Sequence, residues 1–150
     1  MLTAFHVGQT HHLGIPITRD DLARYVALSG DTAPLHVDAE FAKAAGFDGV
    51  VVHGAYLMAL VSRLVGTEFP GARSVLERAD IAFRKPCYAP CDVTLAATVR
   101  QISEAVATIV LDIAITDDSG TVLASGKTWH RILDVGSLND ATDSNLPVTV

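Results

Sequence analysis

The sequence predicts an α+β fold in which an antiparallel β-sheet wraps around one long helix. Residues 54–65 are apolar nearly all round, which is typical of a buried helix rather than a surface helix. The second half of the chain alternates apolar and polar residues with a period of two, which is typical of strands covered on one face only. Because each element offers apolar surface that the other can cover, the economical arrangement packs the helix against the sheet.

Short local signals place the elements of the first half. Residues 3–13 contain enough Phe, Val and Thr to predict a first strand. Thr18 is a suitable N-cap for a helix that ends just before Gly30, and Asp38 is a suitable N-cap for a second, shorter helix. The long helix follows, and Gly66 is expected to end it.

A meander of strands is predicted for the second half. Residues 75–84, 93–100, 107–116 and 121–133 each alternate, and DDSG at 117–120 is a hairpin turn. The apolar faces of the first and third of these strands are expected to consist of Val75, Ala79, Ile81 and Phe83, and of Ala107, Ile109, Leu111, Ile113 and Ile115. Residues 1–133 are therefore expected to form a single domain, and residues 134–150 a loose polar tail.

Composition excludes several classes of partner. The net charge of −6 argues against nucleic acid. The most apolar segment, 49–66, is interrupted by His53, Ser62 and Arg63, so no membrane span is expected. The N-terminus lacks the features of a secretory signal, which favours a cytoplasmic location. In a reducing compartment, Cys87 and Cys91 are expected to be free thiols.

The stretch SGDTAPLHVD, residues 29–38, is the strongest candidate for a site. Pro34 restricts the backbone, so Asp31 and His36 are held by a stiff, non-helical loop. A carboxylate and an imidazole that share one water can remove one proton from it and deliver another elsewhere. The alternative is structural, in which Asp31 caps a turn and His36 is a satisfied polar residue at a helix entry.

Gly54 opens the apolar helix directly after His53. The first backbone N–H groups of a helix have no internal partner and suit a carbonyl oxygen that becomes an enolate. His53 itself is expected to be structural and to hold the loop before the helix. Another group of histidines, at positions 6, 11 and 12, is expected to lie at an exposed strand end and not to bind a metal.

These motifs resemble one known family. G-D-x-x-P-x-H-x-D, then F-A-x-x-A-G-F, then V-H-G and an apolar helix are similar to the MaoC-like dehydratases, nearest to the (R)-specific enoyl-CoA hydratases. The resemblance covers most of the chain, is strongest from Tyr25 to Gly66, and is weaker through FRKP at 83–86. It implies the hotdog fold, a homodimer or a dimer of dimers, and no cofactor or metal.

The resemblance also implies roles for individual residues. Asp31 and His36 match the catalytic pair, and Gly54 matches the donor to the thioester carbonyl. Ser62 matches a polar position beside the pair, with bonding to a backbone carbonyl as the alternative. The implied reaction is the reversible hydration of a trans-2-enoyl-CoA to the (R)-3-hydroxyacyl-CoA, in which Asp31 and His36 activate water.

Two basic residues are candidates for substrate binding. Arg84 and Lys85 are placed to meet the phosphates of coenzyme A, although exposed basic side chains are common. The chain also departs from the family pattern at two places. Ala33 replaces the usual Asn, which removes loop hydrogen bonds, and Pro90 with Cys91 replaces the usual Gly before Asp92.

Three other functions remain open at this point. A dehydratase acting on acyl-carrier protein would need a basic rim, for which the candidates are Arg63, Arg73, Arg78 and Arg84. A non-catalytic acyl-binding subunit of a heteromeric hotdog assembly is favoured by Ala33 but opposed by the presence of both Asp31 and His36. A hotdog thioesterase would not need this loop.

Overall fold

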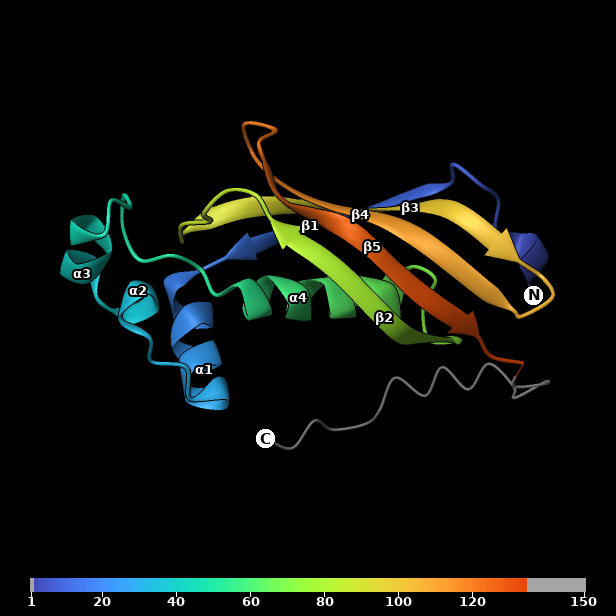
Figure 1. Ribbon diagram of the computed structural model, residues 1–150, viewed down its shortest axis with the longest axis horizontal. Coiled ribbons are helices and arrows are strands. Elements are labelled where there is room, and N and C mark those ends of the chain that lie inside the picture. The colour runs from blue at the N-terminus through green and yellow to red at the C-terminus, as the bar shows by residue number, and fades with distance from the viewer. Residues whose placement is uncertain (1, 135–150) are drawn as a thin grey trace.

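A curved five-stranded sheet wraps around helix α4 (Gly54–Arg63), as Figure 1 shows. The computed structural model describes residues 2–134, so the predicted tail lies, except for Asp134, outside the described residues. All strand pairs are antiparallel, in the spatial order β1-β3-β4-β5-β2. The strands are β1 (Thr10–Ile17), β2 (Ser74–Phe83), β3 (Cys91–Ser103), β4 (Thr108–Asp117) and β5 (Val122–Ile132). The expected α+β architecture is confirmed.

The core lies between the concave face of the sheet and α4. On β4, Ile109, Leu111, Ile113 and Ile115 are all buried, which confirms the predicted apolar face of this strand, although Ala107 lies in the preceding turn with φ 51°. Leu57, Leu60 and Val61 of α4 belong to the same buried cluster. Burying one such side chain contributes about 1.5–3 kcal/mol, so these two elements hold the molecule together.

Helix α4 differs from the prediction at its outer face and at its end. Ala55, Ala59 and Ser62 are exposed in the single chain, so the helix is not buried all round. The chain stays helical beyond Gly66 as a π-helical segment, η2 (Leu64–Glu68). Leu64 and Val65 are buried in the core, and this packing outweighs the low helix propensity of the glycine.

The first strand starts later than predicted. Residues 2–4 form a short 3-10 helix, η1 (Leu2–Ala4), and β1 begins at Thr10. Gly8, with φ of 88°, breaks the extended conformation before the strand. Ile15 and Ile17 of β1 are buried in the core, and Leu13 packs against it. The expectation of a strand over residues 3–13 is therefore wrong for its first half.

Strand β2 contains a bulge that the alternation did not reveal. Its register against β5 shifts between Leu76 and Arg78, where one extra residue is accommodated. As a result Leu76 packs against the core, while Val75 is 44% exposed. Of the predicted core face, Ile81 packs against the core, whereas Val75, Ala79 and Phe83 are exposed, so the prediction is wrong at these three positions.

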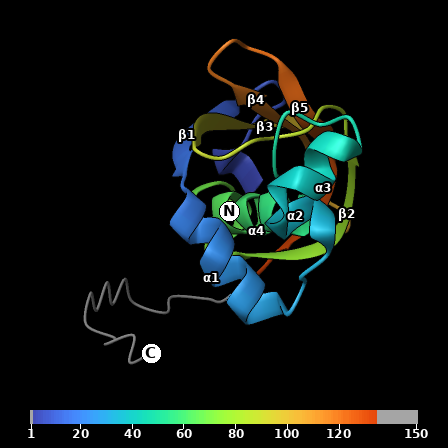
Figure 2. The same cartoon turned by 90° about the vertical axis from the view of Figure 1, so that its left-hand side faces the viewer.

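Three short helices lie together at one end of the sheet, beyond the start of α4 (Figures 1 and 2). They are α1 (Arg19–Ser29), α2 (Pro34–Val37) and α3 (Ala39–Ala44). Thr18 and Asp21 form a capping box on α1, Gly30 ends it in the left-handed conformation, and the Asp38 carboxylate caps α3, all as expected. None of the described helices combines the length and apolarity that a membrane span requires.

Candidate active site

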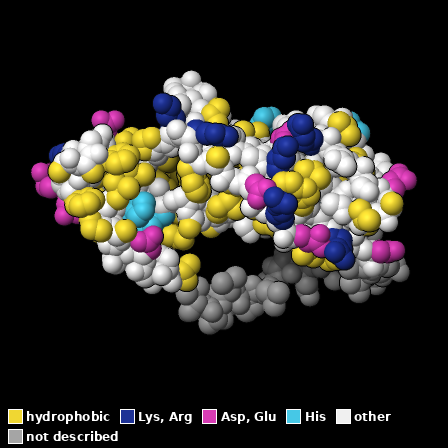
Figure 3. All heavy atoms as spheres, in the orientation of Figure 1, with side chains coloured by type: hydrophobic (Ala, Val, Ile, Leu, Met, Phe, Trp, Pro, Cys, Tyr) yellow, Lys and Arg dark blue, Asp and Glu magenta, His cyan; other side chains and the backbone are white. Residues whose placement is uncertain are grey.

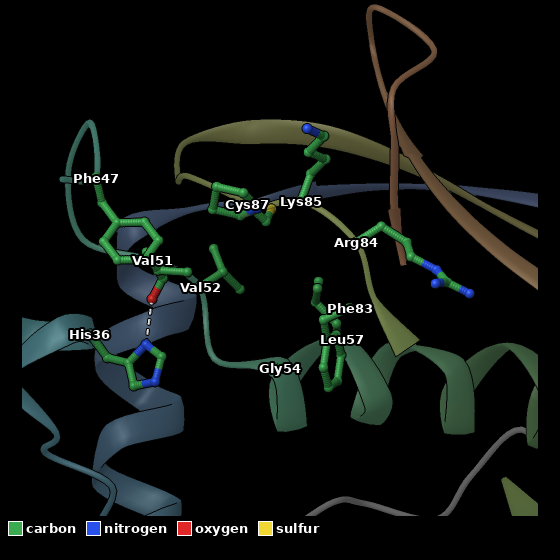
Figure 4. A pocket seen from close by; sticks show the side chains of 11 residues that line it. His36, Phe47, Val51, Val52, Gly54, Leu57, Phe83, Arg84, Lys85 and Cys87 are labelled. Carbon is green, nitrogen blue, oxygen red and sulfur yellow. Dashed lines mark hydrogen bonds between the residues drawn. The ribbon is translucent and has the colours of Figure 1, made fainter. Parts of the chain in front are cut away.

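His36 is held on a helical turn rather than on an irregular loop. Pro34 starts the single turn α2, because its fixed φ suits the first helical position, so the non-helical prediction is wrong from this residue onward. The ring Nδ1 of His36 lies 2.6 Å from the carbonyl oxygen of Val51 (Figure 4). A carbonyl can only accept, so Nδ1 carries the proton and Nε2 of the neutral ring keeps a free lone pair.

Asp31 follows Gly30, which is in the left-handed conformation, and the Asp31 carboxylate binds the backbone two residues further on. Its Oδ1 accepts a hydrogen bond of 3.1 Å from the N–H of Ala33, and its own N–H donates to the Ser29 hydroxyl. The carboxylate remains 47% exposed. Ligand-type atoms of Asp31, His36 and His53 all lie within 4.8 Å of one another. The structure therefore brings together the carboxylate and the imidazole expected to converge.

His53 is the buried third member of this group. The ring is 1% exposed, and its Nε2 lies 3.1 Å from the main-chain oxygen of Asp31 and 4.0 Å from Oδ2 of the same residue. It stacks on His36 with ring centroids 4.0 Å apart, and Tyr25 packs edge-on against it at 5.0 Å. Within the described part of the chain, Nδ1 of His53 has no hydrogen-bond partner.

Gly54 is the first residue of α4 and lies against the ring of Phe83. A cavity of about 320 Å³ opens beside it, walled by His36, Val52, Leu57 and Phe83 (Figure 4). A Cβ added at Gly54 would lie only 2.8 Å from Cε2 and Cζ of Phe83. Only glycine lets the ring lie this close to the helix start. The uncapped N–H groups of α4 thus border a largely apolar cavity.

Two basic residues line the same cavity. Arg84 and Lys85 follow β2 directly, and their main-chain N–H groups donate to the carbonyl oxygen of Leu123. The guanidinium Nε of Arg84 donates to the Ser125 hydroxyl at 3.3 Å. Figure 3 shows a hollow with yellow hydrophobic walls near the α1–α3 end, and Lys and Arg side chains lie along its upper rim. Of the predicted substrate-binding residues, Arg84 and Lys85 therefore lie at the cavity.

Ser62 is not brought to the same place within one chain. It lies eight residues after Gly54, about 12 Å along a helix, on the exposed face of α4, and it does not line the cavity. Three cavity residues that sequence reasoning missed are Phe47, Val51 and Phe83. The FRKP motif was the one sequence signal that could have pointed to Phe83. The role of Val51 could not be found from the sequence, because it is played by a main-chain carbonyl, which every residue has.

The thiols of Cys87 and Cys91 are free, as predicted, with their Sγ atoms 3.5 Å apart. Cys87 lines the cavity, but burial raises the pKa of its thiol to about 12. Burial also raises the pKa of Cys91. Since the thiolate is the nucleophilic form, neither residue is suited to form a covalent intermediate at neutral pH.

Comparisons with known proteins show which family the chain is related to. The MaoC-like domain family matches residues 5–117. An (R)-specific enoyl-CoA hydratase from Aeromonas caviae is 30% identical over 129 residues, covering 86% of this chain and 96% of that protein. A mitochondrial 3-hydroxyacyl-[acyl-carrier-protein] dehydratase from Arabidopsis thaliana is 38% identical over 86 residues, and the chain spans 51% of its length.

Solved structures give the same answer for the fold. The structure of an (R)-hydratase from A. caviae involved in PHA biosynthesis matches with a TM-score of 0.81 and 29% identity, covering 86% of this chain and 98% of that one. An unliganded R-hydratase from Pseudomonas aeruginosa matches with a TM-score of 0.80 at 23% identity, covering 87% of this chain and 84% of that one. With its hotdog fold and matching motifs, the chain belongs to the MaoC-like dehydratase family of carbon–oxygen lyases.

Proposed function

We propose that the protein catalyses the reversible hydration of a trans-2-enoyl-CoA to the (R)-3-hydroxyacyl-CoA. The observation that carries the proposal is the convergence of Asp31 with His36, which lines a cavity together with Gly54 at the N-terminus of α4. The A. caviae relative, which is named for this activity and matches over most of both chains, supports the same reaction.

The geometry suits a one-water mechanism. The hydrogen bond from His36 Nδ1 to Val51 leaves Nε2 able to accept a proton, and Asp31 offers a half-exposed carboxylate within reach of the same water. The water oxygen bonds to C3 of the enoyl group as one of its O–H bonds breaks, and that proton passes to Nε2 of His36. The resulting imidazolium then gives a proton to C2, which returns His36 to its starting state. In between, negative charge collects on the thioester oxygen, where the N–H of Gly54 at the start of α4 stabilises it.

A metal is not required by this scheme. Asp31, His36 and His53 offer the kinds of ligand that transition metals bind, and a carbonyl oxygen on one nitrogen of each ring leaves the other nitrogen available. The proton-transfer roles proposed above use Asp31 and His36 without an ion. We therefore assign the cluster to proton transfer, and dialysis against a chelator is expected to leave the rate unchanged.

The direct test mixes the protein with crotonyl-CoA and follows the loss of the conjugated enoyl-thioester absorbance. The product is then offered to dehydrogenases specific for the (R) or the (S) 3-hydroxyacyl thioester. Turnover to the (R) product supports the proposal. An (S) product, or no hydration at all, contradicts it.

A second candidate is dehydration of a 3-hydroxyacyl chain carried by acyl-carrier protein. It is favoured by the A. thaliana relative, although the chain spans only about half of that protein. Arg84 and Lys85 at the cavity serve either carrier, whereas Arg78 is engaged by Asp80 at 2.6 Å, which weakens a basic rim. Comparing kcat/KM for crotonyl-CoA and for crotonyl-carrier protein distinguishes the two. Binding of both without turnover would instead indicate a non-catalytic acyl-binding subunit.

A further inference from the structure

We propose that His53 is a positioning residue that holds Asp31 and His36 in their reactive arrangement. This proposal rests on the proposed function and adds a residue to its machinery. His53 does not reach the cavity that Gly54, His36 and Phe83 line, and it is almost completely buried. Its influence on the reaction must therefore pass through Asp31 and His36, the two residues of the proposed pair that it contacts.

The contact with Asp31 is made through the main chain. Nε2 of His53 lies 3.1 Å from the Asp31 carbonyl oxygen, which can only accept, so Nε2 carries the proton in this contact. The Asp31 turn has otherwise only local bonds, to Ser29 and to the N–H of Ala33. The His53 bond is therefore the tie that fixes this turn to the start of α4.

The contact with His36 is made through the ring face. The two imidazoles lie 4.0 Å apart at an interplanar angle of 25°, and Tyr25 closes the environment of His53 from α1 at 5.0 Å. The edge of His36 is fixed by the carbonyl of Val51. One hydrogen bond at the edge and one packed face together define a single ring orientation, which directs the free Nε2.

Stability alone does not account for a histidine here. Nδ1 of His53 is buried without a partner among the described residues, which is unfavourable, and a phenyl ring would fill similar space without that cost. His53 is also the N-cap residue of α4, yet its side chain makes no capping bond. The feature that a phenyl ring would lack is the Nε2 donor to Asp31.

The same short segment then joins all parts of the site. The carbonyl of Val51 binds His36, the ring of His53 binds Asp31, and the next residue, Gly54, begins the helix that faces the cavity. Within four residues the chain fixes the carboxylate, the imidazole and the N–H donor relative to one another.

The test compares His53→Phe, which keeps a packed ring without a donor, with His53→Gln, whose amide nitrogen can replace Nε2. His53→Phe is expected to lower kcat by about 10–10²-fold with little change in KM, the scale of a small misplacement of reacting groups. His53→Gln is expected to recover at least part of that loss. The melting temperature of His53→Phe should equal or exceed that of the wild type.

Other results would overturn the proposal. These are an equal loss of kcat in both variants, a change confined to KM, or a loss that only follows a lower melting temperature. A readout independent of activity is hydrogen exchange of the backbone amides of the Asp31 turn, which should be faster in His53→Phe than in the wild type and in His53→Gln. If the wild type does not hydrate crotonyl-CoA, the proposed function fails, while hydrogen exchange still decides whether His53 fixes the Asp31 turn.

Discussion

At the scale of the residue, the site is held largely by main-chain groups. The carbonyl oxygens of Val51 and Asp31 bind the two imidazoles, and the N–H of Ala33 binds the Asp31 carboxylate. Such bonds fix the rotamers of these side chains and leave Nε2 of His36 and Oδ2 of Asp31 for the proton transfers that we propose.

Removing either member of the pair should abolish most of the activity. Asp31→Asn and His36→Ala are each expected to lower kcat by about 10²–10⁴-fold, the usual contribution of a positioned acid or base. The double variant should lose little more than the worse single variant, because the two act on one water. Steady-state hydration kinetics check this, with Asp118→Asn and His12→Gln as exposed controls. Near-full activity of both folded single variants would contradict the catalytic assignment.

Ala33 offers a test in the opposite direction. It is the N-cap residue of α2 and has no capping side chain, while its carbonyl accepts from the N–H of His36 at 2.8 Å. Ala33→Asn supplies a preferred N-cap, worth about 0.5–2 kcal/mol in stability, and should preserve or raise the hydration rate. Chemical denaturation and kinetics measure the two effects. A large loss of rate would mean that substrate occupies the space beside Ala33.

His130 should make stability depend on pH. Burial lowers its pKa to about 4, so between pH 6.5 and 4 the unfolded chain binds a proton that the folded chain does not. The free energy of unfolding should therefore fall as the pH falls through this window, by on the order of 3 kcal/mol in total at about 1.4 kcal/mol per pH unit. Hydrogen bonds lower the pKa values of Asp21 and Asp117, whose contributions are lost only at lower pH.

Urea denaturation at pH 7, 5.5 and 4.5 measures this effect. His130→Leu removes the titrating group, so the free energy of unfolding should fall less between pH 7 and 4.5 than in the wild type. His12→Gln, at an exposed position of β1, should keep the pH dependence of the wild type. If His130→Leu keeps the pH dependence of the wild type, another titrating group causes the loss of stability at low pH.

At the scale of the element, the pairing of β2 with β5 depends on one glycine. A Cβ added at Gly126 would collide with the carbonyl oxygen of Asp80 on β2, whereas a Cβ added at Gly14 on β1 meets nothing within 4 Å. Gly126→Ala is therefore expected to lower the melting temperature strongly and to detach β2, and Gly14→Ala is expected to have little effect. Thermal unfolding and hydrogen exchange of β2 amides test this. Equal behaviour of the two variants would contradict it.

The elements that were predicted correctly are those whose signals are local. Helix α1 has its N-cap, its first-turn acids and its terminal glycine in one short stretch, so Thr18 and Gly30 sufficed. The bulge at residue 77 depends on how β2 meets β5, and the helical course past Gly66 depends on burial of Leu64. Neither the bulge nor the helical course past Gly66 can therefore be predicted from the neighbouring residues alone.

The same distinction holds for the site. The proximity of Asp31 and His36 was predictable because one short motif carries both. The placement of Phe83 over Gly54 required the sheet to bring β2 back to the start of α4, and the carbonyl of Val51 has no sequence signature. The position of Ser62 on an exposed face likewise became visible only when α4 was packed against the sheet.

At the scale of the whole molecule, we expect a homodimer. Strand β2 is an edge of the sheet, with Val75 and Phe83 exposed, and such an edge invites pairing with a second copy. Light scattering should give about twice the chain mass of 15.9 kDa. Val75→Lys should shift the protein toward the monomer, whereas Val106→Lys, at an equally apolar and more exposed position away from β2, should not. A monomeric wild type would contradict this expectation.

The order of the strands in the sheet also sets the order in which the chain can assemble. Strands β3, β4 and β5 follow one another and pair across short turns, whereas Thr10 of β1 must find Thr98 of β3 across all the helices and β2. Pairs that are close in sequence form sooner, because closing a long loop costs more entropy. We therefore expect the meander to form the folding nucleus and the segment from Asp31 to α4 to dock late. Since that segment carries Asp31, His36 and Gly54, the proposed site would be completed only in the last step of folding.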